Sequence, residues 1–227
     1  MMELFNVKPL GKRERFQFKC TRCGECCCKI KQSVMLESLD AYRLAKLLSQ
    51  TDTSIASVED MLLKYADPIP LTDTGFPIYI LKTVGDDDAC IFLKENVCAV
   101  YVARPRTCRT YPITVGPAER GTDFDFDYLL CREKPHHFVG GTIRTKDWIQ
   151  ENFKREDQEF LRAEYESIAK IGRLIDKFPK DNEPQAIMAM LLARYYNYSL
   201  VQSFMPQFRS NMYQLERQLT KLIMEGR

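Results

Sequence analysis

The sequence predicts an α+β protein: a small, loop-rich, cysteine-centred domain with short strands and helices, followed by a C-terminal α-helical bundle. Five of the nine cysteines fall between Cys20 and Cys28, and none lies beyond Cys131. Short segments with strand or helix patterns alternate in the first part of the chain, whereas apolar residues keep helical spacing from Thr145 onward. We therefore expect a cysteine-cluster domain over residues 1–140 and a helical region over residues 145–227.

The first 70 residues predict short strands and two helices. The segments are a short strand ending in Phe16-Gln-Phe18, an extended stretch over 29–35, a helix over 38–50 and a helix that starts at Ser57. Ser57 with Asp60 three residues later is typical of a capping box, in which each residue satisfies a free backbone N–H of the other. Pro68 and Pro70 are expected to end this second helix.

The next 60 residues predict strands separated by turns. The segments are a strand over 76–84, a turn over 85–88, two short strands over 89–93 and 97–102, and a strand over 122–129. The two short strands bring Cys90 and Cys98 close together. In the last strand aromatic residues alternate with aspartates, as in a half-buried strand, and this strand leads to Cys131.

The C-terminal part predicts a three- or four-helix bundle or a helical cap. Its helices run from Thr145 to near Pro179, from Glu183 to Phe204, and onward from Pro206, which suits the first turn of a last helix. These helices are one candidate surface for a protein partner.

Composition limits the other partners that we expect. The 227-residue chain is 45% hydrophobic, and its net charge of +2 is too small a bias to indicate nucleic acid. Residues 1–19 lack the apolar region of a signal peptide, and the longest apolar run, Ala186–Ala193, is too short to span a bilayer. We expect a cytoplasmic protein that binds neither membrane nor nucleic acid. Because thiols stay reduced in the cytosol, clustered cysteines there favour a metal site over disulfides.

The stretch Cys20-Thr-Arg-Cys23-Gly-Glu-Cys26-Cys27-Cys28 has the spacing of metal ligands. Each C-x-x-C step can place two sulfurs on one side of a tight turn, and Gly24 suits such a turn because it tolerates positive φ. The later cysteines are Cys90, Cys98, Cys108 and Cys131.

These motifs together resemble the YkgJ-type cysteine-cluster family, whose members are described as zinc- or iron-chelating domains. The family shows C-x-x-C-G-x-C-C, a second cysteine pair, Y-x-x-R-P-x-x-C-R-x-(Y/F)-P and a last cysteine followed by basic residues. This chain matches over about residues 20–132, at Cys20, Cys23, Gly24, Cys26, Cys27, Cys90, Cys98, Tyr101, Arg104, Pro105, Cys108, Arg109, Tyr111, Pro112, Cys131 and Arg132. Cys28 departs from the pattern, since it makes three cysteines in a row.

The resemblance implies eight metal ligands, Cys20, Cys23, Cys26, Cys27, Cys90, Cys98, Cys108 and Cys131. Eight thiolates suit two Cys₄ zinc sites, a binuclear zinc site with shared ligands, or one [4Fe–4S] cluster with spare ligands. Arg104 and Arg109, which flank Cys108, are the expected cofactor-binding residues, because guanidinium groups offset thiolate charge. The alternative for these cations is a solvated surface.

Two further polar motifs have simpler interpretations. His136-His137 follows the last cysteine and offers a nitrogen ligand, but the family motif contains no histidine, so we interpret it as a surface pair. The run Asp86-Asp87-Asp88 is interpreted as a solvated turn rather than a cation site.

The predicted function is a metal-binding protein, with zinc or an iron–sulfur centre that is at least structural. An alternative is a metal-dependent protein-modifying enzyme, because flagellin lysine N-methylases resemble this family in their cysteine cluster, or a redox protein. The chain shows no recognisable S-adenosylmethionine motif and no familiar catalytic motif. A third alternative is a protein-interaction module with the metal domain as its scaffold.

Overall fold

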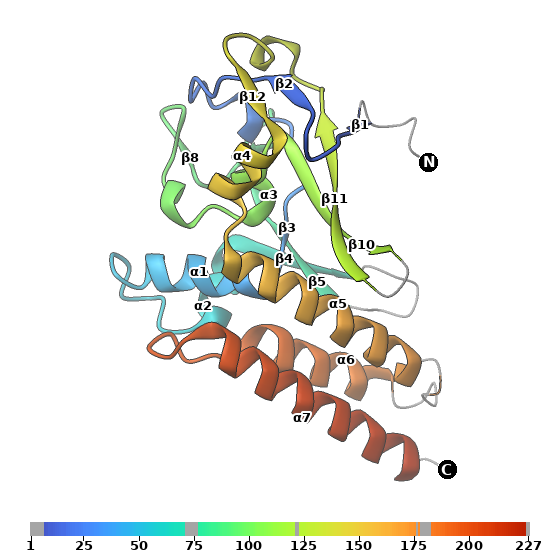
Figure 1. Cartoon of the computed structure of the whole chain (residues 1–227). Helices are drawn as coiled ribbons and strands as arrows, with labels where there is room; N and C mark the ends of the chain where they lie inside the picture. The colour runs from blue at the N-terminus through green and yellow to red at the C-terminus, as the bar shows by residue number, and fades with distance from the viewer. Residues whose placement is uncertain (1–6, 71–76, 121–122, 176, 178–182, 226–227) are drawn as a thin grey trace. The chain divides into compact units, whose positions relative to one another are not determined.

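The computed structural model describes residues 7–70, 77–120, 123–175, 177 and 183–225. Helices and short antiparallel strands are mixed, with a helical C-terminal region, so the predicted α+β class is confirmed (Figure 1). The chain forms two compact units: unit 1 is Met1–Val34 with Thr83–Arg162, and unit 2 is Met35–Lys82 with Ala163–Arg227. The division of the chain into domains 1–140 and 145–227 stays a prediction.

Unit 1 contains a three-stranded antiparallel sheet in the order β1-β11-β10. Its strands are β1 (Val7–Pro9), β10 (Ile113–Arg120) and β11 (Asp123–Cys131). Val7 pairs with Cys131, and Ile113 pairs with Leu130. The strand predicted over 122–129 is therefore present as β11, and its aspartates alternate with the buried Phe126 and Tyr128. Neither β1 nor β10 was predicted, because neither carries a clear alternating pattern.

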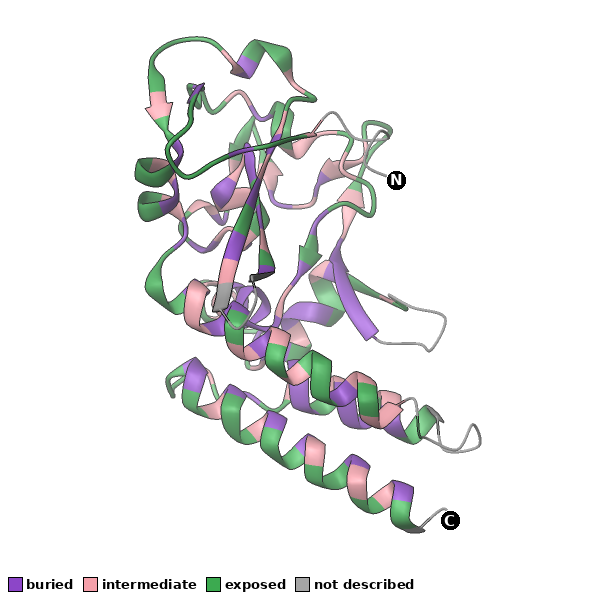
Figure 2. Cartoon of the chain, turned by 45° about the vertical axis from the view of Figure 1, so that its right-hand side comes forward, coloured by how far each residue is buried: buried purple, intermediate pink, exposed green. Residues whose placement is uncertain are grey.

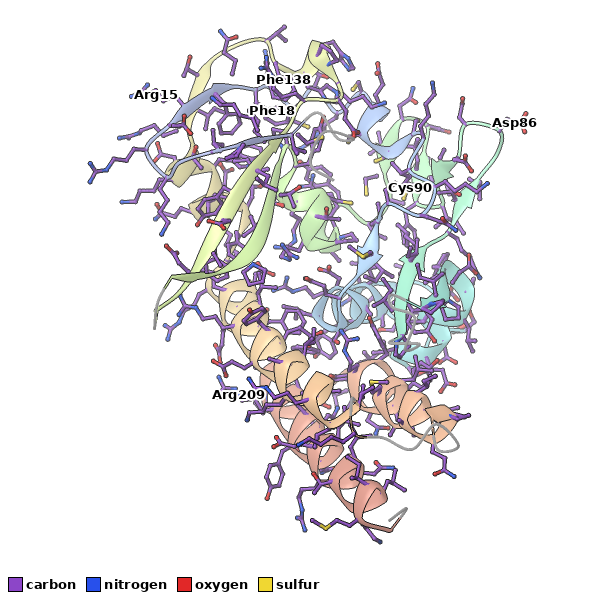
Figure 3. The ribbon with its side chains drawn as sticks, turned by 90° about the vertical axis from the view of Figure 1, so that its right-hand side faces the viewer. Arg15, Phe18, Asp86, Cys90, Phe138 and Arg209 are labelled. Atoms are coloured by element: carbon purple, nitrogen blue, oxygen red, sulfur yellow. The ribbon has the colours of Figure 1, made fainter. Side chains whose placement is uncertain are left out.

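The core of unit 1 lies against this sheet. Phe126 contacts Phe153 edge-on at 5.0 Å between ring centroids, and Phe18 contacts Trp148 at 5.2 Å. Figure 3 shows Phe18 beside Phe138. The rest of this core comes from β2 (Arg15–Gln17), which pairs with β12 (Thr142–Arg144), from α4 (Thr145–Asn152) and from the first turns of α5 (Arg155–Ile175), which supply Phe16, Ile149 and Leu161.

The cysteine-bearing part of unit 1 consists of very short elements. They are η2 (Glu25–Cys27), β6 (Thr83–Val84) paired with β7 (Ala89–Cys90), β8 (Leu93–Lys94) paired with β9 (Val97–Cys98), η3 (Tyr101–Ala103), α3 (Arg106–Thr110) and η4 (Pro135–His137). Six non-glycine residues here have positive φ: Arg22, Lys29, Gln32, Asp88, Glu95 and Asn96. Regular secondary structure therefore contributes little to the stability of this region.

The extended stretch predicted over 29–35 is wrong for most of its length. Residues 31–33 form a turn, and only Met35 joins a strand. The backbone N–H of Lys29 donates to the carbonyl of Asp87, and that of Ile30 donates to the carbonyl of Asp88. These two residues therefore pair with the aspartate turn and not with a strand. Asp86 lies exposed on that turn, as the interpretation of a solvated turn requires, and Figure 3 shows it pointing outward.

Unit 2 begins with two helices and a small sheet. Its elements are β3 (Met35–Leu36), α1 (Ser38–Leu48), α2 (Val58–Tyr65), β4 (Ala66–Pro70) and β5 (Pro77–Leu81), with sheet order β3-β5-β4. The predicted capping box is confirmed, because Ser57 accepts from the Asp60 N–H while Asp60 accepts from the Ser57 N–H. Helix α2 stops at Tyr65, and Pro68 and Pro70 belong to β4, since an edge strand tolerates proline.

The C-terminal helices of unit 2 are α6 (Glu183–Leu191), a π-helical segment over Leu192–Tyr196, and α7 (Phe204–Glu225). The helix predicted over 183–204 therefore ends earlier, at Tyr196. Pro206 lies in the first turn of α7, as predicted. Figure 2 shows buried positions recurring along one side of α7. No helix among the described residues is both long and apolar enough to cross a membrane.

Candidate metal centre

All nine cysteines of the chain belong to unit 1. Five of them, Cys26, Cys27, Cys90, Cys98 and Cys108, influence one another's ionisation and are called the sulfur group below. They come from η2, β7, β9 and α3, and η2 is more than 60 residues away from the other three elements in sequence. Figure 3 labels Cys90 within this loop-rich part of unit 1.

Cys26 and Cys27 are neighbours whose sulfurs lie 4.0 Å apart. Their hydrogen bond, with help from Arg104, lowers the pKa of Cys26 to about 7. The same bond raises the pKa of Cys27 far above its usual value, and burial and the charges of Cys26, Cys90 and Cys108 add to this effect. Cys26 is thus the more readily ionised thiol of the pair, and a bound cation would favour ionisation of further thiols.

Backbone N–H groups support three of the other thiols. Burial raises the pKa values of Cys90, Cys98 and Cys131, but hydrogen bonds from the backbone of Phe92, Val100 and Glu133 lower them in part. In each case a donor lies two residues after the cysteine. Such N–H donors stabilise thiolates and are typical of the surroundings of metal-bound sulfur.

Gly24 allows the N-terminal cysteine motif to approach the β8–β9 hairpin. It is buried with φ +80°, and a Cβ at this position would lie 3.2 Å from the Asn96 carbonyl oxygen and 3.3 Å from Leu93 Cδ1. Only glycine combines this backbone conformation with so close a contact. Gly24 therefore sets how near the loop of Cys23 and Cys26 comes to the hairpin that carries Cys98.

The two arginines expected to bind a cofactor occupy different surroundings. Arg104 lies over the Tyr101 ring at 3.7 Å, and its charge lowers the pKa values of Cys26 and Cys98. Arg109 makes a bidentate ion pair with the buried Asp157, at 2.8 and 2.9 Å. Arg104 thus acts on the sulfur group, and cofactor binding by either arginine stays a prediction.

The remaining cysteines have different surroundings. Cys20 is exposed, three residues before Cys23. Cys28 donates to the carbonyl of Gly24 at 3.7 Å. Cys131 ends β11, and its charge, with those of Cys26 and Cys23, adds to the burial that raises the pKa of Tyr111. Which of these thiols bind a metal stays a prediction.

Cys23, His136 and His137 form a second cluster, called the histidine group below. Their ligand atoms all lie within 4.8 Å of one another. The Sγ of Cys23 lies 3.2 Å from Nε2 of His137, whose Nδ1 is 2.8 Å from the Tyr111 hydroxyl. Burial, with the charge of His136, lowers the pKa of His137, which favours the neutral imidazole, the form that binds metal ions.

The interpretation of His136-His137 as a surface pair is wrong for His137. That side chain is 4% exposed, because it packs edge-on against Phe18 and Tyr111. His136 is exposed, and its Nε2 lies 3.2 Å from a carboxylate oxygen of Glu25. Sequence reasoning missed Tyr111 and Glu25 as partners of these rings. The available signal was the position of the two histidines just after the last motif cysteine.

Comparison with known families gives one match. The family model named CxxCxxCC, with the description "Putative zinc- or iron-chelating domain", matches residues 19–156, which is more than half of the chain. No curated protein and no solved structure matches the chain. The matched range includes all nine cysteines and both histidines.

Proposed function

Because the chain belongs to this zinc- or iron-chelating family, we propose that it is a cytoplasmic metalloprotein whose zinc or iron–sulfur centre holds unit 1 together. The proposed ligands are drawn from Cys20, Cys23, Cys26, Cys27, Cys90, Cys98, Cys108 and Cys131. The observation that carries the proposal is the sulfur group, in which thiols from separate segments lie close enough to influence one another's ionisation.

The surroundings of the sulfur group fit a bound cation. Thiols packed together repel one another once ionised, and this arrangement is costly without a positive charge among them. Arg104 supplies one such charge, and the backbone of Phe92 and Val100 supplies N–H donors. When bound, zinc or an iron–sulfur cluster would neutralise the thiolates and cross-link the segments that carry them.

A structural role follows from how little else stabilises this region. Its strands are two residues long, and six of its residues occupy the left-handed backbone region. The apolar core of unit 1 is formed instead by the β1-β11-β10 sheet, β2 and helices α4 and α5. Metal binding to such loops can contribute about 10 kcal/mol or more to folding.

The test is metal analysis with a visible absorption spectrum on protein purified without oxygen. Stoichiometric zinc without visible absorption, or iron with a cluster spectrum, would support the proposal. Cys108→Ser should lose metal, because it removes a member of the sulfur group. Cys28→Ser is the matched control: its thiol donates to a carbonyl and should leave metal content unchanged. Wild-type protein that holds neither metal would overturn the proposal.

A further inference from the structure

We propose that Cys23, His136 and His137 form a separate mixed-ligand site for a zinc-like divalent ion, beside the sulfur group. This inference rests on the proposed function, since it adds a second metal position to the same unit. Neither histidine belongs to the cysteine motif that identifies the family. The three ligand atoms come from two segments more than 100 residues apart, yet lie within 4.8 Å of one another.

His137 has the surroundings of an oriented metal ligand. Its Nδ1 pairs with the Tyr111 hydroxyl at 2.8 Å, so its Nε2 is the nitrogen directed toward Cys23, 3.2 Å from the sulfur. Phe18 and Tyr111 pack edge-on against the ring and hold its plane. Metal-bound histidines almost always use their second nitrogen in such a hydrogen bond, which fixes the tautomer and the ring orientation.

His136 shows the same division of its two nitrogens. Nε2 lies 3.2 Å from the Glu25 carboxylate, which leaves Nδ1 for an ion. The two imidazole rings are 4.2 Å apart between centroids. A carboxylate that accepts from one ring nitrogen makes the other nitrogen a better donor to a metal. Glu25 follows Gly24 in the cysteine motif, so the motif itself supplies this partner.

The backbone holds the two halves of the site together. The N–H of Lys19, just before Cys20, donates to the carbonyl of His137 at 3.2 Å. Pro135 starts the short helix η4, which presents both histidines in succession. The site is therefore built by main-chain contacts as well as by the ligands.

The ligand set selects the class of ion. One thiolate and two imidazoles match the sulfur and nitrogen preference of zinc, whereas iron–sulfur clusters are bound mainly by thiolates. Three protein ligands leave a fourth position for water or an external ligand, unlike a closed Cys₄ site. The alternative is a purely structural cluster, in which Tyr111 and Cys23 satisfy a buried histidine without an ion.

X-ray absorption at the zinc edge separates these alternatives. His136 and His137 are the only histidines of this chain, so imidazole scattering from an untagged, zinc-loaded sample must come from them. We expect that scattering in the wild type. His137→Gln should lose about one metal equivalent and leave zinc with sulfur ligands alone. Sulfur-only scattering in the wild type, or full metal content in His137→Gln, would overturn the inference.

Variants of exposed residues cover the case in which His137→Gln fails to fold. His136→Gln should weaken cobalt(II) binding at this site at least tenfold, and Glu25→Gln should weaken it by about 10–100-fold, as for other residues that orient a ligand. Glu151→Gln is the matched control, because it removes the same charge from an exposed position on α4. Equal affinity in all three variants would contradict the site. A wild-type chain that binds no metal would overturn both this inference and the proposed function.

Discussion

At the scale of single residues, one glycine governs how the cysteine segments meet. Gly24 and Gly85 both have positive φ, at +80° and +71°. A side chain at Gly24 would contact Asn96 and Leu93, whereas a side chain at Gly85 would have nothing within 4 Å. A substitution at Gly85 therefore tests backbone strain alone, whereas a substitution at Gly24 tests strain together with steric crowding.

We predict that Gly24→Ala destabilises the metal-loaded protein more than Gly85→Ala. Both changes force alanine into the left-handed region, at roughly 1–2 kcal/mol. Gly24→Ala adds crowding, typically about 1–3 kcal/mol, and should also lower metal content, because it displaces the hairpin that carries Cys98. Urea denaturation and metal analysis would measure both effects. Equal losses in the two variants would show that the close approach at Gly24 is unimportant.

At the scale of secondary structure elements, an ion pair fastens α3 to the start of α5 within unit 1. Arg109 of α3 binds both carboxylate oxygens of Asp157, which is 1% exposed. Asp157 also accepts the backbone N–H of Lys154, just before the first residue of α5. The same carboxylate thus caps one helix and anchors another, which positions the turn that carries Cys108.

We predict that Arg109→Met costs about 3–5 kcal/mol, because it leaves the Asp157 charge buried without its cation. Arg144→Met is the control, since it breaks an exposed pair with Asp147 that contributes less than about 1 kcal/mol. Urea unfolding of both variants would measure the difference. A similar, small loss in the two variants would mean that the buried pair adds no net stability.

At the scale of the whole molecule, the two units differ in what stabilises them. Unit 1 contains every cysteine and both histidines, whereas unit 2 contains neither residue type. The apolar residues buried in unit 2 include Leu39, Leu44, Met61, Phe204 and Phe208. It also holds a buried ion pair between Glu164 and Arg194, and Arg194 donates to the carbonyl of Pro77. We therefore expect only unit 1 to depend on metal.

Removal of the metal by a chelator should loosen unit 1 and spare unit 2. Amides of residues 20–33 and 85–108 should lose protection from hydrogen exchange, because the loss of about 10 kcal/mol of binding energy leaves their loops unsupported. Amides of α1, α2 and α7 should keep theirs. Peptide-resolved hydrogen exchange with and without chelator would measure this. Equal loss of protection in both units would contradict a metal role confined to unit 1.

Local pattern accounts for the elements that were predicted correctly. The helix at Ser38, the capping box at Ser57, the strand that ends at Cys131 and the proline in the first turn of α7 each depend on residues a few positions apart. The spaced cysteine motifs were also sufficient to indicate the family. For the helices and the strand, the deciding interactions are between near neighbours in sequence.

The chain alone thus determined the α+β class, the metal-chelating family and most helix starts. Only the tertiary structure decided that residues 35–82 pack with the C-terminal helices, that Arg109 pairs with Asp157, and that His137 is buried beside Cys23. These contacts join residues from about 50 to more than 100 positions apart. Sequence periodicity reports which face of an element is apolar, but burial and pairing depend on which distant surface covers that face.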